Sequence, residues 1–185
     1  PYGLYYAPDP SSQIACSIGG NVAENAGGVH CLKYGLTVHN VLRVRACSIE
    51  GEVVEFGSEA LDAPGYDLLA LIMGSEGMLA VTTEITVKLV PKPHTARVIL
   101  AAFDDVEKAG NAAADMIAAG IIPAGLEMMD QPATRAVEQY VHAGYDLDAA
   151  ALLLCESDGT AEEVEDEIAR MTEVLKRSGA YDFRI

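Results

Sequence analysis

The chain has 185 residues, half of them hydrophobic, with 28 acidic and 12 basic side chains and a formal net charge of −16. This apolar content suits one ordinary domain or two small ones and excludes a disordered chain. Because so negative a surface repels phosphate groups, we expect no nucleic acid partner and no binding to anionic membranes.

Neither a charged-then-apolar leader nor an apolar run long enough for a membrane helix occurs in the chain, so no membrane insertion is expected. Cys16, Cys31, Cys47 and Cys155 stand singly, without metal-binding spacing, which indicates reduced thiols in a cytoplasmic protein. The chain starts with a proline, and residues 180–185 have the pattern of a strand that no further element closes. We therefore expect the chain to be a piece of a longer protein.

The composition of the sequence changes around residues 91–94, which read PKPH. Eleven of the 17 glycines precede His94. Two prolines within three residues prevent strand pairing and stiffen the backbone, as in a linker. The expected domains are residues 1–93 and residues 94–185.

Short strands and turns are expected in the first domain. Residues 38–49 and 52–56 are rich in strand-forming side chains and flank a turn, which predicts a hairpin. Residues 67–73 predict a short helix that ends at Gly74. The alternation of side-chain types then predicts a long strand over residues 78–90. One face of this strand is expected to consist of Val81, Thr83, Ile85, Val87 and Leu89.

Strands and capped helices alternate in the second domain. Strands are predicted at residues 97–103, 126–129, 149–155 and from Ala180 onward. Helices are predicted after Asp104 or Asp105, after Asp130 as far as Gly144, and after the capping box of Thr160 and Glu163. The apolar stripes of the first and last helices are expected at Val106, Ala109, Ala113, Met116 and Ile117, and at Val164, Ile168, Met171 and Leu175. This order predicts a ferredoxin-like α+β sandwich with one extra helix.

Two glycine-rich stretches are the candidates for chemistry. Residues 9–28 contain two diglycine pairs eight positions apart, and glycine amides can approach a ligand closely enough to form a nest for phosphate or a flavin edge. Residues 74–82, GSEGMLAVT, join a helix to a strand and can present backbone groups to a planar ring. The alternative for the first stretch is a loop with two tight turns. The alternative for the second is a helix C-cap followed by a β-bulge.

The strings PDPSS…GGNVAENAGG…LKYG and GYDL…GSEGMLAVTTEITVKLVPKP together resemble the FAD-linked oxidase family of the vanillyl-alcohol oxidase type. Within it, they are most similar to glycolate oxidase flavin subunits and D-lactate dehydrogenases. The resemblance implies an α+β chain: the C-terminal part of a PCMH-type FAD-binding domain in residues 1–93, then the N-terminal part of a ferredoxin-like cap domain in residues 94–185.

The resemblance also implies an activity. It is the oxidation of a small 2-hydroxy acid, of the glycolate or D-lactate type, to the 2-oxo acid by hydride transfer to N5 of FAD. An iron–sulfur subunit is the implied candidate for electron acceptor, and the fragment is expected to be inactive alone. The competing hypothesis is a non-catalytic ferredoxin-like module for interaction or ligand sensing, which leaves both glycine-rich stretches unexplained.

Cofactor-binding residues follow from the same resemblance, position by position. They are Asp9, Pro10, Ser11, Cys16, Gly19, Gly20, Asn21, Glu24, Asn25, Ala26, Gly27, Gly28, Tyr34, Glu76, Gly77, Met78, Leu79, Ala80 and Val81. Many relatives have Thr and Gly where this chain has Met78 and Ala80. The family's earlier pyrophosphate loop and its later substrate-binding histidines and arginine have no counterpart here, so no catalytic residue is assigned.

We expect the isolated histidine and cysteine side chains to have structural roles. His30 is expected to be a structural hydrogen-bonding residue, and the four histidines are too far apart in sequence to predict a metal site. Cys16 and Cys31 are expected to be small buried packing residues, although flavins are covalently attached in some members of this superfamily.

Overall fold

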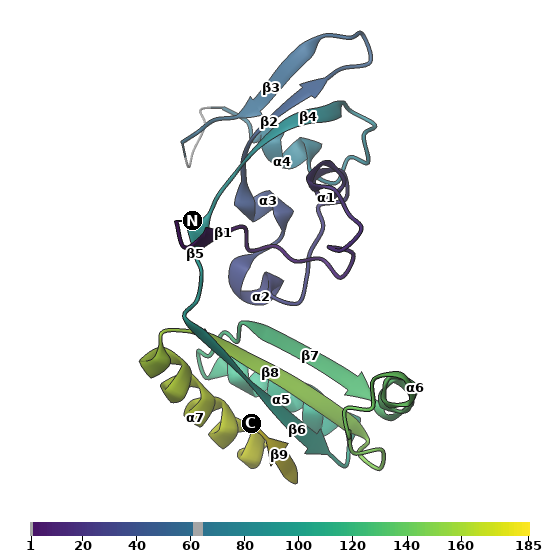
Figure 1. The fold of residues 1–185 in the computed structure, drawn as a ribbon, viewed down its shortest axis with the longest axis vertical. Helices are drawn as coiled ribbons and strands as arrows, with labels where there is room; N and C mark the ends of the chain where they lie inside the picture. Colours follow the sequence, from purple (N-terminus) through teal and green to yellow (C-terminus); the bar gives the residue numbers. More distant parts are fainter. Residues whose placement is uncertain (1, 61–64) are drawn as a thin grey trace. The chain divides into compact units, whose positions relative to one another are not determined.

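The computed structural model describes residues 2–60 and 65–185, and it divides into two units between Lys92 and Pro93 (Figure 1). This division falls inside the proline-rich PKPH stretch. We call the part before the division unit 1 and the part after it unit 2.

A three-stranded antiparallel sheet forms the centre of unit 1, in the order β3-β2-β4. The strands are β2 (Val41–Cys47), β3 (Val53–Gly57) and β4 (Val81–Val87). The predicted hairpin is confirmed, because β2 and β3 pair directly, with Cys47 opposite Val53. Residues 38–40 do not belong to the first strand, however, since they lie in the helical turn α3 (Thr37–Asn40). Side-chain bonds to the backbone stabilise that turn: Leu36 N–H donates to His39 Nδ1, and the Asn40 amide donates to the Leu36 carbonyl.

The long strand predicted over residues 78–90 is shorter, and its side chains do not share one face. Ile85 and Val87 pack against the core, whereas Val81 is 64% exposed and Leu89 is 51% exposed. The cause is a register shift: Arg45 pairs with Glu84 and the next residue, Ala46, pairs with Thr82, so Thr83 is an extra residue in β4. Such a bulge reverses the alternation of the side chains before it.

Short helices and a two-stranded ribbon complete the described part of unit 1: α1 (Ile18–Glu24), α2 (Cys31–Tyr34), α3, α4 (Leu68–Ile72), β1 (Leu4–Tyr5) and β5 (Val90–Pro91). The predicted helix over residues 67–73 is confirmed as α4, with the Asp67 carboxylate accepting from Ala70 N–H. The core between helices and sheet consists of Val22, Val41, Val44, Ala46, Ile72, Met73 and Ala80.

A four-stranded antiparallel sheet, ordered β7-β8-β6-β9, forms unit 2. Its elements are β6 (Thr95–Phe103), α5 (Val106–Ala118), β7 (Gly125–Asp130), α6 (Gln131–Val141), β8 (Ala151–Gly159), α7 (Ala161–Arg177) and β9 (Asp182–Arg184). The first and third strands are central, and α5 and α7 pack on one face of the sheet (Figure 1). This topology confirms the ferredoxin-like α+β prediction, with α6 as the extra helix.

The helix caps of unit 2 lie where the sequence predicts them, but some boundaries and faces differ. All four predicted stripe residues of α7 are buried. In α5, Ala112 is buried, while Val106 and Ile117 are 44% and 45% exposed, contrary to expectation. Helix α6 ends at Val141 rather than near Gly144, because His142 takes the left-handed conformation at φ 52°.

Candidate functional site

The two stretches singled out in the sequence lie side by side in unit 1. The N–H of Gly74 donates to the Val22 carbonyl at 2.9 Å, and the N–H of Glu76 donates to the Ala23 carbonyl at 2.8 Å. Both carbonyls belong to the last turn of α1, where no following helical turn supplies N–H donors for them. The turn after α4 therefore completes the C-terminal end of α1, and the two stretches are in direct contact.

The first diglycine pair is not in a loop, because Gly19 and Gly20 form the first turn of α1. Ser17 caps this helix: its hydroxyl accepts from Gly20 N–H at 3.0 Å. The cap compensates for the poor helix propensity of two glycines. Gly19 is half-buried, but a Cβ atom added to it would meet nothing within 4 Å.

The second diglycine pair follows Asn25, the left-handed C-cap of α1 at φ 49°. The side chain of Asn25 accepts from Val38 N–H at 2.9 Å, and the Ala26 carbonyl accepts from the N–H and the hydroxyl of Thr37. These bonds attach the stretch to α3. Within the described residues, the N–H groups of Gly27 and Gly28 make no hydrogen bond.

Close packing alone, without any ligand, favours glycine at positions 27 and 28. A Cβ atom at Gly28 would overlap the backbone of Asp9, and one at Gly27 would lie 2.8 Å from Leu36 Cδ2. The chain before α1 and the chain after it therefore touch at Gly28. This contact joins the PDPSS segment to the NAGG segment.

A hydrogen bond between side chains holds the same two segments. His30 Nδ1 donates to Asp9 Oδ2 at 2.5 Å, and the backbone N–H of His30 donates to Asp9 Oδ1 at 3.4 Å. The Tyr34 ring packs edge-on against His30, with centroids 6.4 Å apart. The prediction that His30 is a structural hydrogen-bonding residue is confirmed.

The alternative interpretation of residues 74–82 is a helix C-cap followed by a β-bulge, and both features occur in this part of the structure. Gly74 follows α4 with φ 75°, and the bulge at Thr83 lies further along β4. Glu76 itself has a left-handed backbone, with φ 53°. Met78 is 85% exposed and Leu79 is 53% exposed, so the end of this turn presents apolar side chains to the outside.

The predicted site residues differ in what they can offer a ligand. Asn21 and Ala80 are 7% exposed, so they can contact a cofactor only through small portions of their surface. The side chain of Tyr34 packs against Tyr5 and His30. The exposed members are Ser11, Cys16, Gly20, Glu24, Glu76, Gly77, Met78, Leu79 and Val81.

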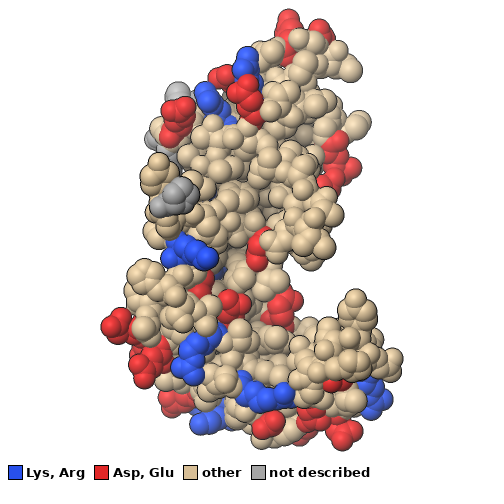
Figure 2. Space-filling model, viewed as in Figure 1, with Lys and Arg blue, Asp and Glu red and all other residues tan. Residues whose placement is uncertain are grey.

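Charge is sparse on much of unit 1. Figure 2 shows that most of its visible surface carries neither acidic nor basic side chains. The basic residues Arg43 and Arg45 are paired on the sheet: Arg45 contacts Glu84 at 2.8 Å and Arg43 contacts Glu55 at 3.7 Å. Exposed apolar side chains near α1 and the turn include Ile14, Ile18, Met78, Leu79 and Val81.

Two buried polar residues near the site were not found by sequence reasoning. Asn40 is 2% exposed, and its amide donates to the carbonyls of Tyr34 and Leu36. Thr37 is fully buried. Burial raises the pKa of Tyr6, whose hydroxyl lies beside Thr37. A single Asn in a helical turn gives no signal for such a role, because its partners depend on how the neighbouring turn folds.

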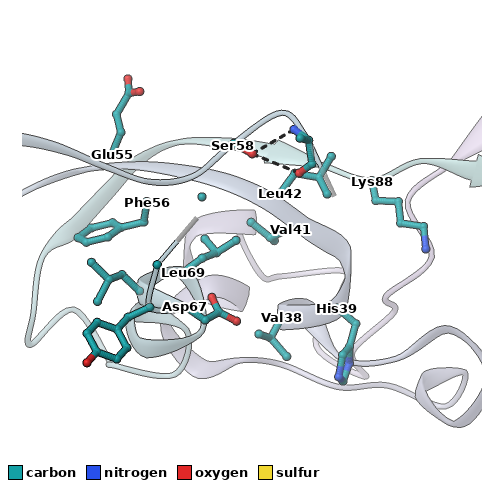
Figure 3. Close-up of a pocket in the computed structure, with 15 residues that line it drawn as sticks. Val38, His39, Val41, Leu42, Glu55, Phe56, Ser58, Asp67, Leu69 and Lys88 are labelled. Carbon is teal, nitrogen blue, oxygen red and sulfur yellow. Dashed lines mark hydrogen bonds between the residues drawn. The ribbon is translucent and has the colours of Figure 1, made fainter. Parts of the chain in front are cut away.

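A pocket of about 630 Å³ in unit 1 was also not anticipated (Figure 3). Val41, Phe56 and Leu69 contribute apolar lining, and His39 and Lys88 contribute polar lining. None of the predicted cofactor-binding residues lines it. It is formed by segments that are separated in the sequence, so no local pattern reveals it.

The part of the chain that the structure describes contains no group of three or more His, Cys, Asp or Glu side chains that could hold a metal ion. In the same residues, no helix combines the length and the apolarity needed to cross a bilayer. Each of the four cysteines is a free thiol, and burial raises the pKa of Cys155 to about 12. The prediction that Cys16 is a buried packing residue is wrong, because Cys16 is exposed, and Cys31 is only half-buried.

Together, the fold and the matches to family models define the class of this chain. Residues 1–57 match the model "FAD binding domain", and residues 92–185 match the model "FAD linked oxidases, C-terminal domain". The chain belongs to the FAD-linked oxidase family. The resemblance inferred from the sequence motifs is thereby confirmed, as is FAD as the cofactor of the family.

Curated relatives are similar along nearly the whole chain. The glycolate oxidase subunit GlcD of Escherichia coli (strain K12) is 64% identical over all 185 residues, which is 37% of its own length. The GlcD subunit of Bacillus subtilis (strain 168) is 43% identical over 96% of this chain and 38% of its own length. A D-lactate dehydrogenase of Anaerostipes hadrus is 33% identical over 97% of this chain and 39% of its own length. The chain thus spans well under half the length of these relatives.

The fold also matches a solved structure. An alkyldihydroxyacetonephosphate synthase superposes with a TM-score of 0.81 at 22% identity, covering 97% of this chain and 35% of that chain. At this identity the match concerns the fold alone. It confirms the expected α+β fold class of the chain.

Proposed function

We propose that this chain is part of an FAD-dependent oxidoreductase that oxidises a small 2-hydroxy acid, of the glycolate or D-lactate type, to the corresponding 2-oxo acid. The 64% identity to a glycolate oxidase subunit over every residue of the chain carries the proposal. The two family matches, one named for FAD binding and one for FAD-linked oxidases, point to the same chemistry.

The proposed domain assignment follows the division of the chain at Lys92 and Pro93. Residues 1–93 would be the C-terminal part of an FAD-binding domain, and residues 94–185 the N-terminal part of the cap domain. The match of residues 92–185 to the oxidase model supports the second assignment, and it favours a cap over an independent sensing module.

The proposed flavin surface comprises residues 9–11, Cys16, residues 19–21 and 24–28, Tyr34 and residues 76–81. The backbone bonds between α1 and the turn at Gly74 and Glu76 support it, because they bring its two main segments into contact. The unpaired N–H groups of Gly27 and Gly28 are available to an electron-rich ligand edge. The exposed Met78 and Leu79 offer apolar contact to a planar ring.

FAD, when bound, accepts the hydride from the substrate carbon. The residues of this chain would position the cofactor: the open helical turn at Gly19 allows close approach, and the flanking apolar side chains exclude water. No residue described here is assigned to take the hydroxyl proton.

Partner and compartment belong to the same proposal. The word "subunit" in the names of two relatives supports an electron-accepting partner, for which an iron–sulfur subunit is our candidate. The four free thiols support a reducing compartment such as the cytoplasm.

Purification of the protein at its natural length tests the function directly. The preparation should be yellow, should release FAD on denaturation, and should reduce an artificial electron acceptor with glycolate or D-lactate as the substrate. A colourless protein that FAD cannot reconstitute, or a flavoprotein inactive on every short 2-hydroxy acid, would contradict the proposal.

A further inference from the structure

The contact between Asp9 and His30 closes a segment that contains much of the proposed flavin surface. The two residues are 21 positions apart, and α1 and both diglycine pairs lie between them. A closed loop has fewer unbound conformations than an open one, so the closure lowers the entropy that a ligand must remove on binding.

The bond itself has the geometry of a strong interaction. The side chains of His30 and Asp9 are only 26% and 23% exposed, and Nδ1 and Oδ2 are 2.5 Å apart. An ionised carboxylate can only accept, so the imidazole donates from Nδ1. Hydrogen bonds to a charged group at this distance and with this burial are stronger than neutral, exposed ones.

Neighbouring groups fix both partners in place. The Tyr34 ring lies against His30, and the Tyr5 ring lies against Tyr34 with centroids 6.2 Å apart. The backbone of Asp9 touches Gly28, where a Cβ atom would not fit. The carboxylate can therefore move little without loss of packing around it.

On the basis of the proposed function, we propose that Asp9 and His30 are a positioning pair for flavin binding. The Asp9 carboxylate acts here through its hydrogen bond to His30. Its effect is to hold the PDPSS segment against the NAGG segment, so that α1 and its flanking turns present a preformed surface.

A double-mutant cycle in the protein at its natural length tests the pair. Asp9→Ala, His30→Ala and the double variant are prepared as apoprotein, and FAD itself is titrated at a temperature where circular dichroism shows every variant folded. Each single variant should raise the Kd for FAD at least about tenfold, and the double variant should be no worse than either single one. The His30→Asn variant should restore affinity to within about threefold of wild type, because its amide nitrogen occupies the position of Nδ1.

The control is Asp104→Asn in unit 2, which removes another carboxylate paired with a cation, Lys108 at 2.9 Å. It should leave the Kd for FAD unchanged. If wild type binds FAD and the single variants bind it equally tightly, or if their effects are additive, the positioning pair is overturned while the proposed function stands. Wild-type protein unable to bind FAD would overturn the proposed function and the pair with it.

Discussion

Glycines with the same sequence signature have different structural roles in this chain. Gly28 has no space for a side chain, because the backbone of Asp9 occupies the position of its Cβ. Gly19, in the other diglycine pair, has only open space around it. Packing within unit 1 therefore requires a glycine at position 28. At position 19 no such packing requirement exists, so a ligand can be the reason for the glycine.

Substitution of Gly28 by Ala should therefore destabilise unit 1 without any cofactor present. Overlap with backbone atoms cannot be relieved by rotation of a side chain, so we expect a loss of about 1–3 kcal/mol in the free energy of unfolding. Urea denaturation of the apoprotein measures it. Gly110→Ala is the matched control, since a Cβ there meets nothing within 4 Å, and it should be neutral or stabilising. Equal stability of Gly28→Ala and wild type would contradict the observed contact.

The thiols should differ sharply in reactivity. Burial raises the pKa of Cys155 to about 12, so its thiol remains protonated and unreactive at pH 8, while Cys16 is exposed. Because the unfolded thiol ionises at a lower pH than the folded one, this group makes the fold less stable as the pH rises from about 9 toward 12. Labelling with iodoacetamide and peptide mass spectrometry should find Cys16 modified and Cys155 unmodified in the folded state. Rapid labelling of Cys155 would show that β8 is not buried as described.

At the scale of elements, capping residues determine where the helices begin. Asp67, Asp105, Asp130 and Thr160 each accept a hydrogen bond from an N–H in the first turn of the helix that follows. These bonds connect residues two or three positions apart, so the sequence alone predicts the caps of unit 2. The bulge at Thr83 was not predictable in this way, because it depends on how β4 pairs with β2.

Helix α7 provides the test of a cap. The Thr160 hydroxyl accepts from Glu163 N–H, and the Glu163 carboxylate accepts from Thr160 N–H at 2.9 Å. Thr160→Ala should lower the free energy of unfolding of unit 2 by about 1 kcal/mol. Glu165→Gln, an exposed change on the same helix, should alter it by less than about 0.5 kcal/mol. A Thr160→Ala variant as stable as the Glu165→Gln control in chemical denaturation would rule out this contribution of the cap.

At the scale of the whole chain, unit 2 was predictable in outline and unit 1 only in its motifs. The helices of unit 2 are long, amphipathic and capped, so their order defines the ferredoxin-like topology. Unit 1 consists of short elements held by contacts distant in sequence, such as Gly74 with Val22 and Asp9 with His30. The resemblance to a family singled out the two glycine-rich stretches as the proposed flavin surface, but the hydrogen bonds that join them were not predictable.

We propose that α1 and the turn after α4 form a surface for FAD, and a substitution at Gly19 probes that surface. Gly19→Leu places a side chain in open space, so it should leave the fold intact but prevent close approach of the cofactor. The matched control is Gly110→Leu, at another open helical glycine in unit 2. Titration of FAD into the natural-length apoproteins should show at least about a hundredfold weaker binding for Gly19→Leu, about 2.7 kcal/mol, and wild-type affinity for Gly110→Leu. Wild-type affinity in a folded Gly19→Leu variant would contradict the account.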